Sequence, residues 1–330
     1  MTTYKDAGVD IDLANKSLDS AKKHIKSTFN KNTISDLGAF GGCYLFPKDE
    51  YSDPVLISST DGVGTKLKIA FLTNRHDTIG QCLVNHCVND ILVLGAKPLF
   101  FLDYFAAGKL NSATFNDVIA GMSKACKENK CVLIAGETAE MPGFYNGEDY
   151  DLSGTVVGVA NKQDMLSNRK IKKGDILIGL HSTGLHTNGY SLARKVLLNN
   201  YSIDDIINDF DKTLGEILLS IHKSYLHSIL PILDMPWLHG LSHITGGGII
   251  ENTTRILPPG QQIKIDWKSW ETPPIFDIIE NLGSVPKDDM RRSFNMGIGM
   301  ILVVDKTNIN DAISSLKKSK ENYTVIGEIV

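Results

Sequence analysis

The chain has 330 residues, enough for about two domains of roughly 100–200 residues each. Hydrophobic residues make up 42% and charged residues 22% of it, so a well-buried core can form. The formal net charge of −4 and the pI near 6.1 argue against a nucleic-acid-binding protein, because such proteins normally carry a basic surplus. No apolar run approaches the ~20 residues that span a bilayer. The N-terminus also lacks the apolar core of a signal peptide. We therefore expect neither nucleic acid nor a membrane as a partner.

The five cysteines are sparse and odd in number. Their spacing does not fit a zinc ribbon, and we expect reduced, buried thiols in a cytoplasmic protein. They are Cys43, Cys82, Cys87, Cys126 and Cys131.

The first half of the chain alternates predicted helices and strands. A polar helix is expected over residues 11–29, followed by a glycine-containing turn at 38–42 and a buried strand at 54–60. Apolar residues at three- and four-residue spacing predict a helix over 77–95. Strands are then expected at 98–106, 131–135 and 152–160, with a helix at 115–128.

A polar stretch at residues 161–174 marks the expected boundary, which gives domains of 1–165 and 166–330. Beyond it, strands are expected at 175–180 and 297–304. Helices are expected at 190–199, 213–233, after residue 249, and 308–318. Alternating strands and helices indicate an α/β class with a sheet in each half.

The segment of residues 60–66 follows directly on a predicted buried strand. Gly62 and Gly64 allow the backbone to approach an anion closely. Lys66 adds a cation, and Asp61 adds a hard oxygen ligand for magnesium. A plain turn would also use glycines, and the spacing is not that of the common phosphate loop.

Two further acidic residues lie near predicted element ends. Asp90 shares a helix side with apolar neighbours, where a carboxylate is costly unless paired or metal-bound; a surface aspartate is the alternative. Glu137 follows the strand predicted to end at residue 135, where α/β proteins place ligands. Glu140 is either a further ligand or a cap of the turn that follows it. If Asp61, Asp90 and Glu137 converge, their repulsion implies Mg²⁺.

Three loops of the second half carry candidate binding groups. Ser182 and Thr183 precede a helix start that can hold a phosphate, and His186 can carry a proton. Three successive glycines, Gly246 to Gly248, favour a ligand because they are costly to order. Asn295 can hydrogen-bond an amide, although close packing also explains the glycines that follow it.

In this order the loops resemble one family, the phosphoribosylformylglycinamidine cyclo-ligases, also called aminoimidazole ribonucleotide synthetases. The most specific segments are Tyr-Lys-Asp-Ala-Gly-Val at residues 4–9 and Glu-Thr-Ala-Glu-Met-Pro at 137–142. Others are Thr-Asp-Gly-Val-Gly-Thr-Lys at 60–66, His-Thr-Asn-Gly-Tyr-Ser-Leu at 186–192 and Phe-Asn-Met-Gly-Ile-Gly-Met at 294–300. Leu185 departs from the proline expected in many relatives.

The resemblance implies two α+β domains, the C-terminal one with a mixed sheet and helices, and a homodimer whose N-terminal sheets pair into a barrel. It implies ATP and Mg²⁺, with formylglycinamidine ribonucleotide as the second substrate. ATP would phosphorylate the formyl oxygen, and the amidine nitrogen would then expel phosphate and close the imidazole ring.

The resemblance also implies residue roles. Magnesium ligands would be Asp61, Asp90 and Glu137. The remaining ATP contacts would be Lys22, Gly62, Gly64, Thr65, Lys66 and Thr138. The reacting groups would lie near His186, Asn188 and Lys66, and the substrate would contact Lys5, Asp6, Ser182, Thr183, Gly246, Gly247, Gly248 and Asn295.

Three rival interpretations remain. A selenophosphate synthetase would need a reactive cysteine, for which Cys43 is the only choice in the sequence and has no adjacent lysine. A thiamine monophosphate kinase would lack the two most specific segments. A noncatalytic nucleotide-binding protein would not require three separated acids together with paired glycine loops.

Overall fold

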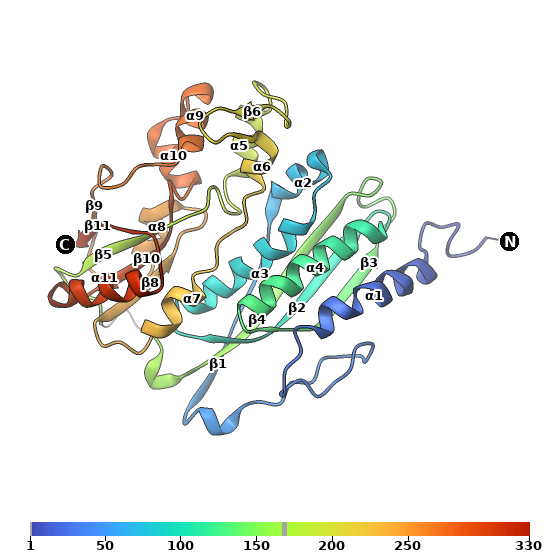
Figure 1. The fold of residues 1–330 in the computed structure, drawn as a ribbon, viewed down its shortest axis with the longest axis horizontal. Coiled ribbons are helices and arrows are strands. Elements are labelled where there is room, and N and C mark those ends of the chain that lie inside the picture. Colours follow the sequence, from blue (N-terminus) through green and yellow to red (C-terminus); the bar gives the residue numbers. More distant parts are fainter. Residues whose placement is uncertain (1, 167–169) are drawn as a thin grey trace. The chain divides into compact units, whose positions relative to one another are not determined.

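The structure, a computed structural model, describes residues 2–166 and 170–330. The chain forms two compact units, Met1–Ile91 with Pro98–Asn161, and Leu92–Lys97 with Lys162–Val330. Part of the polar stretch predicted as the boundary, residues 167–169, lies outside the described residues. A sheet with helices in each unit confirms the predicted α/β class (Figure 1).

The N-terminal unit is built on a four-stranded sheet of order β1-β4-β2-β3. Its strands are β1 (Pro54–Gly62), β2 (Lys97–Ala107), β3 (Val132–Glu140) and β4 (Tyr150–Asn161). The β1–β4 pair is antiparallel and the β2–β3 pair is parallel. Helix α4 (Ser112–Glu128) makes the crossover that a parallel pair requires.

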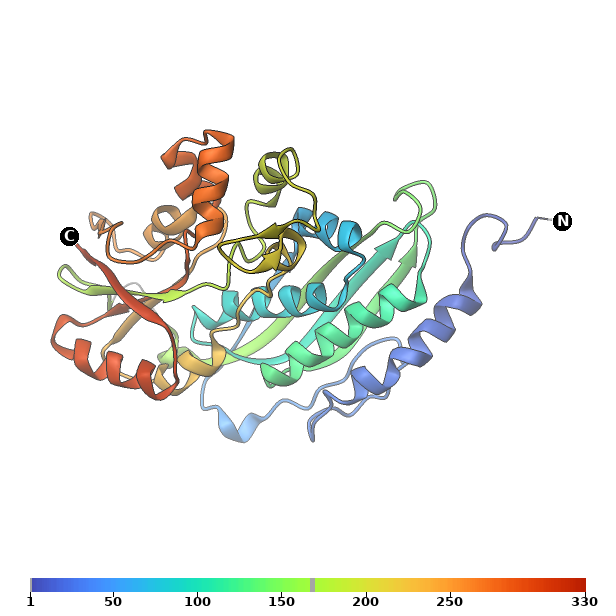
Figure 2. The same ribbon diagram turned by 45° about the horizontal axis from the view of Figure 1, so that its top comes forward.

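Helices lie side by side on one face of this sheet, as both ribbon views show (Figures 1 and 2). They are α1 (Ile11–Lys26), α3 (Asp77–Leu92) and α4, with the shorter α2 (Leu67–Thr73) nearby in sequence. Asp10 caps α1, since its side chain accepts from the Leu13 N–H, and Asn111 caps α4 in the same way. Phe105 of β2 packs edge-on against Phe115 of α4, which fixes this helix on the sheet.

The expectation of a buried strand at 54–60 is only partly met. Strand β1 is an edge strand, and only Ile57 is fully buried along it. Leu56 on the opposite side of the strand is 62% exposed. The apolar run in the sequence therefore reflects two apolar faces, of which only one is covered within the chain.

The C-terminal unit contains a five-stranded sheet of order β8-β10-β5-β11-β9. The strands are β5 (Ile176–His181), β8 (Leu238–His243), β9 (Ile263–Ile265), β10 (Ile298–Val304) and β11 (Tyr323–Ile329). All of its described pairings are antiparallel, which corrects the mixed sheet expected here. Two strands of two residues each, β6 (Ile206–Ile207) and β7 (Lys212–Thr213), pair with each other in a separate sheet.

The helices of this unit are mostly short. They are α5 (Tyr190–Leu197), α6 (Leu214–Leu218), α7 (Leu226–Ile229), α8 (Gly248–Thr254), α9 (Pro274–Gly283), α10 (Lys287–Ser293) and α11 (Ile309–Lys318). The single helix predicted over residues 213–233 is wrong, because the chain leaves helical geometry between α6 and α7. The predicted start is retained, since Thr213 and Glu216 form a capping box.

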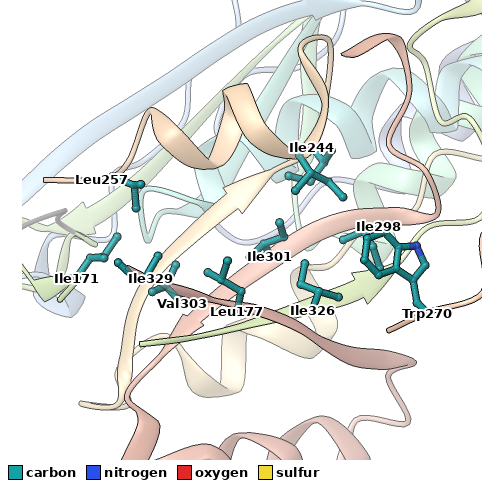
Figure 3. Packing of buried hydrophobic residues seen from close by; sticks show 11 residues of the cluster. Ile171, Leu177, Ile244, Leu257, Trp270, Ile298, Ile301, Val303, Ile326 and Ile329 are labelled. Carbon is teal, nitrogen blue, oxygen red and sulfur yellow. The ribbon is translucent and has the colours of Figure 1, made fainter. Parts of the chain in front are cut away.

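A branched aliphatic core lies against the C-terminal sheet (Figure 3). Every residue of β10 is buried, as expected for a strand with neighbours on both edges and apolar layers on both faces. Ile298, Ile301 and Val303 from this strand pack with Leu177 and Ile326 from β5 and β11. Among the described residues, the chain has no helix long and apolar enough to span a bilayer.

Candidate active site

The N-terminal unit brings Asp61 and Asp90 together around one buried histidine. The Nε2 atom of His86 lies 2.9 Å from Asp61 Oδ2 and 4.0 Å from Asp90 Oδ2. Asp61 ends β1, whereas His86 and Asp90 occupy successive turns of α3 on one side of the helix. The two carboxylates therefore lie within about 7 Å of each other, and His86 is a site residue that the sequence did not single out as functional.

Hydrogen bonds orient both carboxylates. The Gly62 N–H donates to Asp61 Oδ1 at 2.7 Å, and the Ser59 hydroxyl donates to Asp90 Oδ2 at 3.0 Å. Burial and the nearby Asp90 charge raise the pKa of Asp61, but His86 and the Gly62 amide outweigh them and hold this pKa below its usual value. Asp61 is thus kept ionised and available to a cation.

The third expected metal ligand does not join this group within one chain. Glu137 lies inside β3, opposite Tyr104, rather than after the strand end. Strands β1 and β3 form the two edges of the sheet, three strand spacings or about 14 Å apart. Because Mg²⁺ ligands lie near 2.0–2.1 Å from the ion, Asp61 and Glu137 of one chain do not share an ion in this arrangement. The predicted convergence failed because β4, later in sequence, inserts beside β1.

The other predicted ATP contacts are scattered through the N-terminal unit. Lys66 is buried and its Nζ donates to Cys82 Sγ at 3.2 Å, and burial lowers its pKa. Gly64 has a φ of 54°, a left-handed conformation that favours glycine. Lys22 is partly exposed on α1 and pairs with Asp19 at 2.6 Å.

The N-terminal segment is tied to the end of β3. Lys5 pairs with Asp10 at 2.6 Å, and the Asp10 N–H donates to Glu140 Oε2 at the same distance. The second oxygen of Glu140 accepts from the Leu110 N–H. Glu140 therefore binds backbone groups of two distant segments rather than capping the turn that follows it. Asp6 accepts from Thr3 close to the chain start.

The C-terminal unit brings its glycine-rich loop against the loop that follows β5. Asn188 Oδ1 accepts from the Gly246 N–H at 3.1 Å. Asn188 Nδ2 is buried and makes no hydrogen bond within residues 2–166 and 170–330, so it can donate to a ligand. Gly247 and Gly248 have φ values of 98° and 67°, and a Cβ at Gly248 would overlap the Arg291 carbonyl.

Asn295 and Ser182 fasten the same loop. Asn295 is 2% exposed, its Nδ2 donates to the Gly184 carbonyl at 2.8 Å, and its Oδ1 accepts from the Ser182 hydroxyl at 3.1 Å. The Thr183 N–H donates to His186 Nε2 at 3.2 Å. Asn295 therefore positions the loop in this structure.

His186 belongs to a cluster of three buried histidines. Its ring stacks on the ring of His222 with centroids 4.1 Å apart, and His222 Nε2 lies 3.1 Å from His243 Nε2. One of these two nitrogens must donate while the other accepts, so their tautomers are coupled. His222 was not anticipated, because it lies where a regular helix was predicted.

Comparisons with known proteins place the chain in one class. Residues 48–160 match the family AIR synthase related protein, N-terminal domain, and residues 172–330 match the C-terminal domain of the same family. The fold is shared with a thiamine-monophosphate kinase from Stenotrophomonas maltophilia K279a (TM-score 0.69, 14% identity, 95% of this chain and 92% of that one). It is also shared with E. coli HypE, a hydrogenase maturation protein (TM-score 0.67, 16% identity, 96% and 91%). The chain is thus an AIR synthase related protein.

Curated relatives narrow this class. A phosphoribosylformylglycinamidine cyclo-ligase from Thermoanaerobacter sp. (strain X514) is 50% identical over 329 residues, covering 99% of this chain and 97% of the relative. One from Alkaliphilus oremlandii is 47% identical over 330 residues with the same coverage. The chain belongs to the phosphoribosylformylglycinamidine cyclo-ligase family, which confirms the resemblance seen in its motifs.

Proposed function

We propose that the protein closes the imidazole ring of 5-aminoimidazole ribonucleotide from formylglycinamidine ribonucleotide, with ATP converted to ADP and phosphate, in de novo purine biosynthesis. The observation that carries this proposal is identity of 47–50% with named cyclo-ligases over 99% of the chain. The alternative, a selenophosphate synthetase, is not favoured by these relatives.

The chemistry requires a poor leaving group to become a good one. An amide oxygen leaves poorly, whereas the same oxygen leaves readily as phosphate, so transfer of the ATP γ-phosphoryl group activates the formyl carbon. The amidine nitrogen then attacks that carbon, phosphate departs and the ring closes. The protein contributes positioning and neutralisation of charge.

Two carboxylates in the N-terminal unit suit a hard divalent cation. We assign Mg²⁺ to Asp61 and Asp90, because both are oriented by hydrogen bonds and both approach His86. The ion would offset charge on the triphosphate. Gly62, Gly64, Thr65, Lys66 and Lys22 are proposed to contact ATP, as are Glu137 and Thr138 without a shared ion.

The C-terminal unit supplies the proposed substrate contacts. Asn188 Nδ2 is an available donor for a phosphate, and His186 is proposed to move a proton beside the reacting groups. Gly246, Gly247 and Gly248 are proposed to let the backbone approach this phosphate closely, while their N–H groups donate to Asn188, Arg292 and Thr245. Ser182, Thr183 and Asn295 would hold this loop, while Lys5 and Asp6 would act from the N-terminal segment. Residues 1–165 would thus bind ATP and dimerise, and residues 166–330 would complete the site.

We further propose a cytoplasmic homodimer. The face of the N-terminal sheet opposite its helices exposes Leu56 and Tyr104, which are 62% and 39% exposed. An uncovered apolar sheet face favours association with a second copy, in agreement with the barrel that the family implies.

Four of the five cysteines are buried thiols, whereas Cys43 is exposed, contrary to expectation.

The decisive test measures ADP release with formylglycinamidine ribonucleotide present and absent. We expect ADP formation to depend on this substrate and to match 5-aminoimidazole ribonucleotide formation one to one. Substrate-independent hydrolysis, or no hydrolysis with both substrates present, would contradict the assignment.

A further inference from the structure

A cavity of about 320 Å³ lies in the N-terminal unit, bounded by α1, the loop of residues 36–41, α4 and β3. This volume is typical of a small-molecule site. Apolar side chains line it from α1 (Leu18 and Ile25), α4 (Phe115 and Ile119) and β3 (Leu133). Phe40 stands at its rim with its ring fully exposed.

Asp103 of β2 contributes a carboxyl group to the wall of this cavity. It lies between Phe101 and Phe105, both buried, on a strand flanked by β4 and β3. Its register partner on β3 is Gly136, where a Cβ would overlap Asp103 Oδ1. Glycine at 136 therefore leaves the space that the carboxyl occupies.

The carboxyl group of Asp103 can be either protonated or ionised when a ligand binds. Burial, with a smaller contribution from the negative charge of Glu137, raises its pKa to about 7. No cationic side chain in the described part of the chain forms an ion pair with it. A ligand can therefore meet either a carboxylate or a carboxylic acid at this position.

A single carboxyl in an apolar cavity suits a ligand with an N–C–N edge. A carboxylate accepts two N–H groups from an amidinium, and a carboxylic acid accepts one N–H and donates to a neighbouring ring nitrogen. Both pairings satisfy the two oxygens at once, which matters because a polar group left unpaired in an apolar cavity is costly.

We propose that Asp103 binds the amidine-type N–C–N edge of a substrate within this cavity. The inference rests on the proposed function, whose two substrates both carry such an edge: N1 and the 6-amino group of adenine in ATP, and the amidine of formylglycinamidine ribonucleotide. The apolar walls and the exposed ring of Phe40 favour the flat adenine base.

Two substitutions of Asp103 distinguish whether the N–C–N edge belongs to adenine or to the amidine. Asp103→Leu removes both hydrogen bonds, so the KM for the substrate that Asp103 binds should rise about tenfold or more. Asp103→Asn keeps one acceptor and one donor. If the edge belongs to adenine, Asp103→Asn keeps the KM for ATP within about threefold, and its amide can also turn to pair with hypoxanthine. The ratio of kcat/KM for ITP to that for ATP at pH 8 should then rise about tenfold.

If the edge belongs to the amidine, Asp103→Asn removes the charge that holds an amidinium. The KM for formylglycinamidine ribonucleotide should then rise about tenfold in both variants, while the KM for ATP stays unchanged. Either pattern supports the proposal and names the source.

The matched control is Asp151→Asn, an exposed aspartate on β4 of the same sheet. It should leave both KM values and the nucleotide ratio unchanged. The proposal is overturned if folded Asp103→Leu leaves both KM values within about twofold of the wild type. Should Asp103→Leu not fold, an Asp103→Asn enzyme with wild-type KM values and nucleotide ratio overturns it instead. An inactive wild-type enzyme would count against the proposed function, because the inference concerns only changes relative to it.

Discussion

At the scale of single residues, the Asp61–His86–Asp90 group brings two carboxylates close together. Two carboxylates face one imidazole, and each is also held by a hydrogen bond from β1. Such an arrangement stores repulsion that a divalent cation would relieve. The hydrogen bonds already orient both carboxylates, so neither side chain needs to move far to bind an ion.

Substitution of Asp90 by asparagine tests this group. We expect Asp90→Asn to lower kcat/KM for ATP roughly 100-fold or more, because one oxygen ligand loses its charge. Stability should change little, since the Ser59 hydroxyl can donate to the amide oxygen. Steady-state ADP release and a thermal melt measure both effects, and Asp117→Asn, at an exposed position of α4, provides the control. Retained turnover would remove Asp90 from the metal role.

The raised pKa of Asp103 makes a prediction about pH and stability. Between pH 4 and about 7 the folded protein holds a proton on Asp103 that the unfolded chain releases. The free energy of unfolding should therefore fall as pH rises through this window, by at most a few kcal/mol. Thermal melts from pH 4 to 8 should show a weaker decline in Asp103→Asn than in the wild type. Parallel curves would mean that Asp103 titrates normally.

Sequence motifs identified many of the polar residues but not what each one contacts. Asp61 and Asp90 were predicted as partners and both approach His86, but Glu137 was separated from them by the order of strands. Strand order depends on pairing between distant segments, and no local pattern encodes it. Asn295 and Glu140 were also singled out, but the groups that they bind lie in distant segments and became apparent only in the structure.

At the scale of elements, glycines set how closely α3 approaches α4. A Cβ at Gly80 would overlap the Val118 carbonyl, and a Cβ at Gly121 would overlap the Asp77 carbonyl. The two helices therefore pack backbone against backbone along the sheet (Figure 2). Because α3 carries His86 and Asp90, this contact also positions the candidate metal site.

Alanine at position 80 should force the helices apart. We expect Gly80→Ala to destabilise the protein by about 1–3 kcal/mol, as overpacking does, and to lower Tm by roughly 2–10 °C. Differential scanning calorimetry measures the change. Gly41→Ala is the matched control, since a Cβ there meets nothing within 4 Å. An unchanged Tm in Gly80→Ala would show that α3 and α4 can separate freely.

Helix periodicity predicted α3, α4 and α11 well but failed over residues 213–233. Apolar residues recur through that segment at helical spacing. The chain between α6 and α7 is nevertheless not helical, and it buries His222 against His186 and His243. Contacts with distant residues outweighed local propensity there. Short strands such as β9, in which Ile263 and Ile265 are partly buried and Lys264 is exposed, gave no pattern strong enough to predict.

At the scale of the whole molecule, the N-terminal sheet has one face covered by helices and one face that this chain leaves partly open. Ile57 and Ser59 point toward the helical side, since Ile57 is buried and Ser59 bonds to Asp90 of α3. Side chains alternate along a strand, so Leu56 points to the other face. Tyr104 of β2 lies on that face for the same reason, because Phe105 contacts α4.

A charge at Leu56 should therefore separate the proposed dimer. We expect the wild type to sediment as a dimer and Leu56→Asp to sediment as a monomer at micromolar concentration, because a carboxylate would be buried unpaired in the apolar interface. Analytical ultracentrifugation measures the mass of each. Ile206→Asp introduces the same charge at a site that is 64% exposed in the C-terminal unit and should leave the mass unchanged. A dimeric Leu56→Asp variant would place the interface elsewhere, and a monomeric wild type would contradict the proposed dimer.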